Sequence, residues 1–276
     1  MKKISLIALL ACAVGSSNAA ARGVTAYLPL RLEPEIERQI ERVLILADKP
    51  VMTRPVAAAM VLDALPKACA IDAVLCRQVG RYLARFTQSA GISHASVDGG
   101  ATDASGAAMP NRYGMSNASE WQASMIGYVQ PFATVLLTLG GVAYDNDAVP
   151  LGSVLSIGFD RAQLDVGYRG HWLSPFTDSS MLLSTEALTM PSATLSNYLP
   201  LTRLGLHYEA FIAEMSKSDR IAFQGGFTSG NPDVFGLHLS MEPATGWSLG
   251  LNRIMQHGGG ARGGNSFGDV LDAFFR

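Results

Sequence analysis

The chain has 276 residues, of which 48% are hydrophobic and 16% are charged, and its formal net charge at pH 7 is −2. Soluble domains usually contain about 25% charged residues, so this composition favours a large core or a single membrane domain. Glycine is abundant, at 28 residues, which suits tight turns and crowded sheets better than helices.

The amino terminus has the features of an export signal. Lys2 and Lys3 precede an apolar run over 4–14, and Ser17-Asn18-Ala19 forms a small-residue cleavage site. We therefore predict a signal peptide over 1–19 with cleavage near Ala19. An alternative is a lipoprotein box that ends at Cys12. The mature chain has no apolar run of 18 residues that could span a membrane as a helix, so a membrane location would require a closed barrel.

Two cysteines remain after the signal, Cys69 and Cys76. A cysteine pair in an exported protein predicts a disulfide. A continuous helix would separate the two by about 10 Å, which is beyond disulfide reach, so the chain must turn near Ile71 and Asp72, with Asp72 capping the next helix. Two free thiols are the alternative, and no further metal ligands lie nearby.

Residues 20–88 are predicted to form a helical module that plugs the rest of the protein. Apolar residues recur at helical spacing after Pro34, after Thr53, which we expect to cap the second helix, and over 73–86. Between residues 22 and 88 there are ten Lys or Arg and seven Asp or Glu, whereas the remaining mature chain has nine and sixteen. This contrast predicts electrostatic docking of the module in or under the β domain; dispersed, screened surface charges are the alternative.

The remaining chain is predicted to be mainly β. Residues 89–118 are expected to form a linker that can include one short strand at 92–97, followed by barrel strands over 119–276. The expected strands are 121–129, 132–144, 154–159, 163–169, 181–185, 194–198, 203–215, 220–228, 234–242 and 247–255. The glycine-rich stretch 258–264 lacks the lysine of a phosphate-binding loop and is expected to be a flexible loop.

The strand at 163–169 has two chemically different faces. Leu164, Val166 and Tyr168 alternate with Gln163 and Asp165, so one face is apolar and the other polar. A soluble sandwich also alternates. Export, strands of ten or more residues, and aromatic residues near strand ends together favour a transmembrane outer-membrane β-barrel.

Several strings of residues along the chain resemble a known family. They are Tyr27-Leu28-Pro29-Leu30, 34–42, 62–66, 162–169, His171-Trp172-Leu173-Ser174-Pro175, Met190-Pro191-Ser192 and 195–198. The family they resemble is the capsule assembly family typified by Wzi. The resemblance implies an eighteen-stranded outer-membrane barrel, closed on the periplasmic side by an amino-terminal helical bundle. It also implies a surface lectin that anchors capsular or related exopolysaccharide.

The strand count departs from that pattern, because about ten strands are predicted and the stretch 266–276 has helical rather than alternating spacing. An open barrel leaves edges that lipid cannot satisfy. We therefore expect the chain to be an incomplete, carboxy-terminally truncated part of a longer barrel.

The loop after the strand at 163–169 is the predicted polysaccharide-binding site, through Arg169, His171, Trp172 and Asp178. These residues could instead belong to the interfacial aromatic girdle or brace a lumen loop. His171, Ser174 and Asp178 also suggest a hydrolase, but no oxyanion arrangement is visible and Pro175 follows the serine. We predict no enzymatic activity, cofactor or metal.

Two functions remain open at this stage. The first is a polysaccharide-binding surface anchor in the cell outer membrane, and the second is a porin-type channel gated by the helical module. The expected partners are capsular or extracellular polysaccharide and outer-membrane lipid. We expect a monomer and no nucleic-acid partner.

Overall fold

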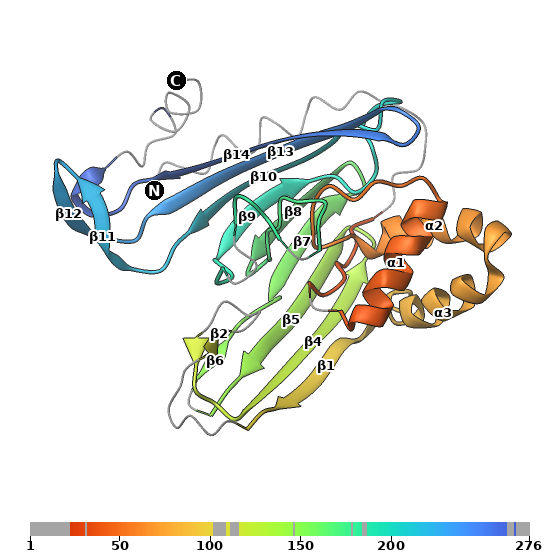
Figure 1. Cartoon of the computed structure of the whole chain (residues 1–276), viewed down its shortest axis with the longest axis horizontal. Helices are drawn as coiled ribbons and strands as arrows, with labels where there is room; N and C mark the ends of the chain where they lie inside the picture. The colour runs from red at the N-terminus through yellow and green to blue at the C-terminus, as the bar shows by residue number, and fades with distance from the viewer. Residues whose placement is uncertain are drawn as a thin grey trace.

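The computed structural model describes residues 23–30, 32–101, 109–110, 116–145, 147–177, 179–183, 187–263 and 268. Three helices at the beginning of the chain lie at one end of a long, curved antiparallel sheet that the rest of the chain forms (Figure 1). The predicted signal peptide, 1–19, lies outside the described residues.

The helical module consists of α1 (Pro34–Leu46), α2 (Ala58–Ile71) and α3 (Ala73–Leu83), followed by a 3-10 turn, η2 (Ala84–Phe86). The three helices share an apolar core that includes Val43, Val61 and Val79. Among the described residues, no helix is long and apolar enough to cross a membrane.

The turn between α2 and α3 places the two cysteines side by side. The Asp72 carboxylate accepts hydrogen bonds from the backbone N–H groups of Val74 and Leu75, at 3.1 and 3.0 Å, and so caps α3. The Cα atoms of Cys69 and Cys76 are consequently 5.0 Å apart and the disulfide forms.

The second helix begins later than the sequence predicts. Its N-cap is Ala57, not Thr53, and Pro66 lies inside it. The residues before it are extended because they pair with other segments: Tyr27 forms a bridge with Ala57, and Arg54 with Trp172.

The main sheet has the strand order β1-β4-β5-β7-β8-β9-β10-β13-β14, with β6 pairing beside β7 on β5. Every neighbouring pair is antiparallel. The strands are β1 (Ala90–Gly99), β4 (Trp121–Phe132), β5 (Val135–Ala143), β6 (Ala148–Val149), β7 (Val154–Phe159), β8 (Ala162–Gly167), β9 (Ser192–Ser196), β10 (His207–Glu214), β13 (Asp233–Ala244) and β14 (Trp247–His257). Two small hairpins stand apart from it: β2 (Met109–Pro110) with β3 (Ser116–Asn117), and β11 (Ser218–Phe223) with β12 (Gly226–Gly230).

Three predicted segments differ from the structure. The single strand predicted at 220–228 is interrupted at Gln224 and Gly225 and is divided between β11 and β12. The stretch expected to be a linker with a short strand contains β1, which pairs with β4 from Ala90 to Gly99. Its many small polar residues suggested a linker, yet Ser93 is buried against the sheet interior while Ile92 and Val97 are exposed. The strand predicted at 181–185 is absent over 181–183, because Leu183 instead packs inward on the cluster around Phe211.

The sheet buries its polar face and exposes its apolar face. Apolar side chains such as Leu155, Val166 and Leu251 are exposed, whereas the alternating positions Ser156 and Asp165 are buried. Polar residues buried along the strands are Ser93, Ser124, Ser156, Gln163, Asp165, Ser192, Thr194, Ser196, Glu209, His238 and Ser240. A soluble sandwich would bury the opposite face, so this is the pattern of a barrel wall with an apolar outside and a polar lumen.

The two rims of the sheet differ in the length of their connections. At the rim beside the helices, three connections are the two-residue turns 133–134, 160–161 and 245–246, and the fourth, 197–206, is longer (Figure 1). At the opposite rim the connections are much longer, as in 168–191 and 215–232. Outer-membrane barrels have short periplasmic turns and long extracellular loops.

The chain ahead of α1 crosses the concave, polar face of the sheet. We call residues Gly23–Leu30 the N-terminal segment. Val24 donates a backbone hydrogen bond to Ala133 at 2.7 Å, and the Tyr198 hydroxyl donates to the Gly23 carbonyl at 2.5 Å. Gly23 has no space for a side chain, because an added Cβ would lie 1.8 Å from the Ala133 carbonyl oxygen.

Candidate functional site

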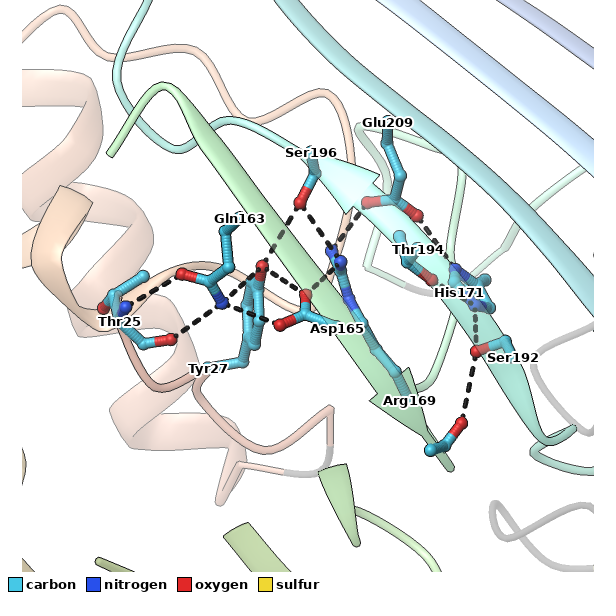
Figure 2. Close-up of polar contacts among 11 residues, drawn as sticks. Thr25, Tyr27, Gln163, Asp165, Arg169, His171, Ser192, Thr194, Ser196 and Glu209 are labelled. Atoms are coloured by element: carbon cyan, nitrogen blue, oxygen red, sulfur yellow. Dashed lines mark hydrogen bonds and ion pairs between the residues drawn. The ribbon is translucent and has the colours of Figure 1, made fainter. Parts of the chain in front are cut away.

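A row of polar side chains from three neighbouring strands forms the centre of the lumen. Gln163 pairs in register with Ser196, and Asp165 with Thr194. Ser196 in turn pairs with Glu209 on the next strand. Because register partners share a face, these residues converge on the concave side, where Asp165 is fully buried (Figure 2).

Arg169 links the two buried carboxylates of this row. Its Nη1 donates to Asp165 Oδ2 and its Nη2 to Glu209 Oε2, each at 2.7 Å, while Nη1 also reaches Ser196 Oγ at 3.2 Å (Figure 2). Burial alone would lower the pKa of the guanidinium, but Glu209, Tyr27 and Asp165 outweigh it and hold that pKa above its ordinary value. Arg169 is therefore a permanent cation between two anions.

His171 extends the row on the other side of Glu209. Its Nδ1 lies 2.9 Å from Glu209 Oε1 and its Nε2 lies 3.2 Å from Ser192 Oγ, while the ring stacks on Phe211 with centroids 3.8 Å apart. Burial lowers the pKa of the imidazole below its ordinary value, against the opposing effect of the Glu209 carboxylate. The Ser192 hydroxyl donates to the Gly167 carbonyl at 3.3 Å, so a neutral His171 that donates from Nδ1 to Glu209 can accept at Nε2 from the Thr194 hydroxyl, 3.4 Å away.

The same row holds the N-terminal segment. The Gln163 amide pairs with Thr25 as a strand backbone would, since Oε1 accepts from the Thr25 N–H at 2.9 Å and Nε2 donates to the Thr25 carbonyl at 3.2 Å. The Tyr27 hydroxyl donates to Asp165 Oδ2 at 2.9 Å, and the Arg169 guanidinium lies 4.2 Å from the Tyr27 ring centroid (Figure 2). Burial raises the pKa of the Tyr27 phenol, so the hydroxyl keeps its proton and remains a donor.

The long connection 168–191 folds inward and meets the helical module. Arg54 and Trp172 exchange two backbone hydrogen bonds, of 2.9 and 3.0 Å. The Arg54 side chain forms ion pairs with Glu41 and Glu37 on α1. One stretch of chain is therefore tied both to the sheet and to the helices.

These contacts bear on the docking that the charges predict. Hydrogen bonds that involve Gln163, Tyr27 and Tyr198 attach the N-terminal segment to the sheet. The ion pairs of Arg54 lie within the module and those of Arg169 within the sheet. Hydrogen bonds account for these contacts, and electrostatic docking of the two parts stays a prediction.

Two cavities flank the N-terminal segment. One, of about 140 Å³, lies on the side of β4, β5 and β7 and is lined mainly by apolar residues such as Leu136. The other, of about 70 Å³, lies on the side of β9, β10 and β13 and is lined in part by Met241. Tyr27, Pro55 and Arg169 line both cavities and therefore lie between them.

The fold agrees with comparisons to known proteins. The model of the capsule assembly protein Wzi family matches residues 95–276.

The chain belongs to the capsule assembly protein Wzi family. It is similar to a solved structure of Wzi from Escherichia coli, described as an outer-membrane protein involved in group 1 capsule assembly and a carbohydrate-binding β-barrel. The TM-score is 0.65 and the sequence identity 15% over 92% of this chain, which spans 56% of the Wzi chain. No curated protein matches the chain.

The Wzi family match includes most of the interior row but not its amino-terminal partners. Gln163, Asp165 and Glu209 lie inside the matched range, whereas Thr25 and Tyr27 precede it. The structural similarity to Wzi covers nearly the whole chain, and it confirms the predicted class of fold, a mainly β antiparallel sheet with amino-terminal helices.

The structure places three of the four predicted sugar-binding residues in the interior. Arg169 and His171 are buried in the row described above, and Trp172 is buried with its Nε1 donating to the Phe176 carbonyl at 2.9 Å. Asp178 lies outside the described residues. The pair considered for hydrolysis is not joined: His171 bonds to Glu209 and Ser192, whereas Ser174 Oγ accepts from the Phe176 N–H.

Three residues of the interior row, Gln163, Asp165 and Glu209, and their partner Tyr27 were not among the predicted site residues. The alternation along β8 does place Gln163 and Asp165 on one polar face, so the sequence carries a signal for them. No sequence pattern connects Tyr27 with Asp165, because 138 positions separate them. Among the described residues, no group of three or more His, Cys, Asp or Glu could hold a metal ion.

Proposed function

We propose that the chain forms part of an outer-membrane β-barrel that binds capsular or related exopolysaccharide and helps to anchor it at the cell surface. The observation that carries the proposal is a sheet with an apolar outside and a polar inside in a member of the capsule assembly protein Wzi family. The carbohydrate binding described for the similar Wzi structure supports it.

We further propose that the rim with short turns and helices faces the periplasm and the rim with long connections faces outward. In this orientation the helical module lies at the periplasmic opening. The connections 168–191 and 215–232 then lie on the side where capsular polysaccharide is found.

The proposed anchor predicts that loss of the gene moves polysaccharide from the cell surface into the medium. The measurement is the ratio of cell-bound to released polysaccharide in a deletion strain, with the complemented strain as control. An unchanged ratio would contradict anchoring. Membrane fractionation of the complemented strain checks the outer-membrane location separately.

The buried residues near the predicted sugar-binding loop favour a role in holding the lumen together. Arg169 and His171 direct their polar atoms at Asp165, Glu209 and Ser192, so we infer that they brace the N-terminal segment and the inward-folded connection. Direct sugar contact by Arg169, His171, Trp172 and Asp178 stays a prediction. A porin-type channel is disfavoured by the N-terminal segment, which occupies the concave face.

A further inference from the structure

The β11–β12 hairpin is the most prominent excursion from the main sheet. It interrupts the connection between β10 and β13 and forms a separate two-stranded sheet. Figure 1 shows it at the end of the sheet remote from the three helices. It therefore belongs to the rim of long connections.

The hairpin is held in place by the glycine-rich turn after β14. The side chain of Ile221 is buried, and Thr228 Oγ1 accepts a hydrogen bond from the Ala261 N–H at 3.1 Å. An added Cβ on Gly260 would lie 2.4 Å from the Ser229 carbonyl oxygen, and one on Gly230 would lie 2.2 Å from the Gly260 nitrogen. The turn thus fits against the inner face of the hairpin only because it carries no side chains there.

The opposite face of the hairpin exposes an aromatic ring beside polar groups. Phe227 is 73% exposed and pairs in register with the small residue Ala222, so its ring is not covered by its cross-strand neighbour. Arg220 is exposed at the register shift between Ser218 and Ile221, and Gln224 is exposed at the tip of the same hairpin. Within the part of the chain that the structure describes, the Arg220 side chain has no ion-pair partner.

We propose that this face of the hairpin, formed by Arg220, Gln224 and Phe227, is a polysaccharide-binding site. An exposed aromatic ring can stack on the C–H face of a sugar ring, while a guanidinium can donate paired hydrogen bonds to a carboxylate of an acidic sugar. A hairpin that is already fixed loses little conformational entropy on binding. The inference rests on the proposed function and names the site at which it occurs.

The test uses the full protein in detergent and polysaccharide extracted from the surface of the bacterium that carries the gene. The Phe227→Ala variant is expected to weaken binding about tenfold or more, as loss of an aromatic anchor does, and Phe227→Trp is expected to retain it. The matched control is Phe132→Ala, because Phe132 is 68% exposed but lies beside the short turn 133–134 at the opposite rim.

The role of the hairpin's position can be tested by a substitution that leaves Phe227 unchanged. Gly260→Ala introduces the clash with Ser229 and is expected to weaken binding, whereas Gly246→Ala is the control. Gly246 also has a positive φ, of 76°, but no atom within 4 Å of an added Cβ. Circular dichroism of each variant verifies that the barrel is folded.

Different results would contradict the hairpin site and the proposed polysaccharide-binding function. If wild-type protein binds the extracted polysaccharide and Phe227→Ala binds it equally tightly, the hairpin site is wrong and the proposed function stands. If Phe132→Ala and Phe227→Ala weaken binding alike, the effect is general to exposed aromatic residues and the site is also wrong. If wild-type protein does not bind, the proposed function itself fails.

Discussion

At the scale of single residues, the lumen depends on one cation shared by two buried anions. Asp165 and Glu209 are almost completely buried, and Arg169 binds both. A buried ion pair contributes little compared with an apolar replacement, but removal of one partner leaves an uncompensated charge. The three groups must therefore be treated as a unit.

Arg169→Ala is expected to lower the free energy of unfolding by about 3–5 kcal/mol, because it leaves two buried carboxylates without a cation. Urea unfolding of the protein in phosphatidylcholine vesicles measures this. The triple variant Asp165→Asn, Arg169→Met, Glu209→Gln removes all three charges and should recover most of the loss. A single variant as stable as wild type, or a triple variant as unstable as the single one, contradicts this account.

His171 gives the protein a defined pH dependence. Its pKa is lower in the folded protein than in the unfolded chain, so the unfolded state takes up the proton first as the pH falls. The associated stability is present above the unfolded pKa of about 6.5 and is lost as the pH falls below that value. Unfolding free energies at pH 7.5 and 5.5 should differ more in wild type than in His171→Asn, which keeps a donor for Glu209; equal differences would exclude His171 as the origin.

At the scale of elements, a glycine on one strand leaves space for a large side chain on its neighbour in the lumen. Phe211 on β10 pairs in register with Gly236 on β13, and an added Cβ on Gly236 would lie 2.1 Å from the Phe211 ring. That ring also stacks on His171. Gly236 therefore leaves space for the Phe211 ring, and that ring in turn packs on His171 in the connection 168–191.

Gly236→Ala should destabilise the protein by about 1–3 kcal/mol, the range for overpacking in a filled interior. The measurement is again urea unfolding in vesicles. Gly236→Ala combined with Phe211→Leu provides the control, since the smaller side chain removes the clash and should restore part of the loss. A Gly236→Ala variant with wild-type stability would show that the ring can move at no cost.

The sequence predicts strands well where apolar and polar side chains alternate and poorly where they do not. The alternation of Leu164 and Val166 with Asp165 specifies β8 and its polar face. The strand considered at 92–97 lies inside β1, but the full length of β1 is hard to predict because its inward side contains small residues such as Ser93, which are also common in linkers. Arg169 and His171 are recognisable as site residues, but their burial depends on the inward fold of 168–191, and Tyr27 meets Asp165 only through tertiary structure.

At the scale of the whole molecule, the N-terminal segment separates the lumen into two cavities. Tyr27, Pro55 and Arg169 lie between the cavities, and Tyr27 is held by Asp165 and Ser196. The helical module adds a second closure at the rim with short turns (Figure 1). Over the described residues, the sheet therefore has a filled concave face and does not enclose an open pore.

Tyr27→Ala should join the two cavities but leave ion conductance across a planar lipid bilayer low, because the helical module still closes the rim with short turns; wild-type protein should also remain closed. Tyr27→Phe keeps the ring that lies between the cavities and should also remain closed, although it loses the hydrogen bond to Asp165. High conductance of the wild-type protein would instead favour the porin-type alternative.

The strand order also restricts how the wall can be closed. The continuous path contains nine strands, each antiparallel to its neighbours, so its two edge strands, β1 and β14, run in the same direction. They cannot pair with each other in an antiparallel ladder. An antiparallel barrel needs an even number of strands, so whatever closes this wall must contribute an odd number. A single added hairpin would leave two parallel neighbours, whereas one strand, or a hairpin plus one strand, would complete the ladder.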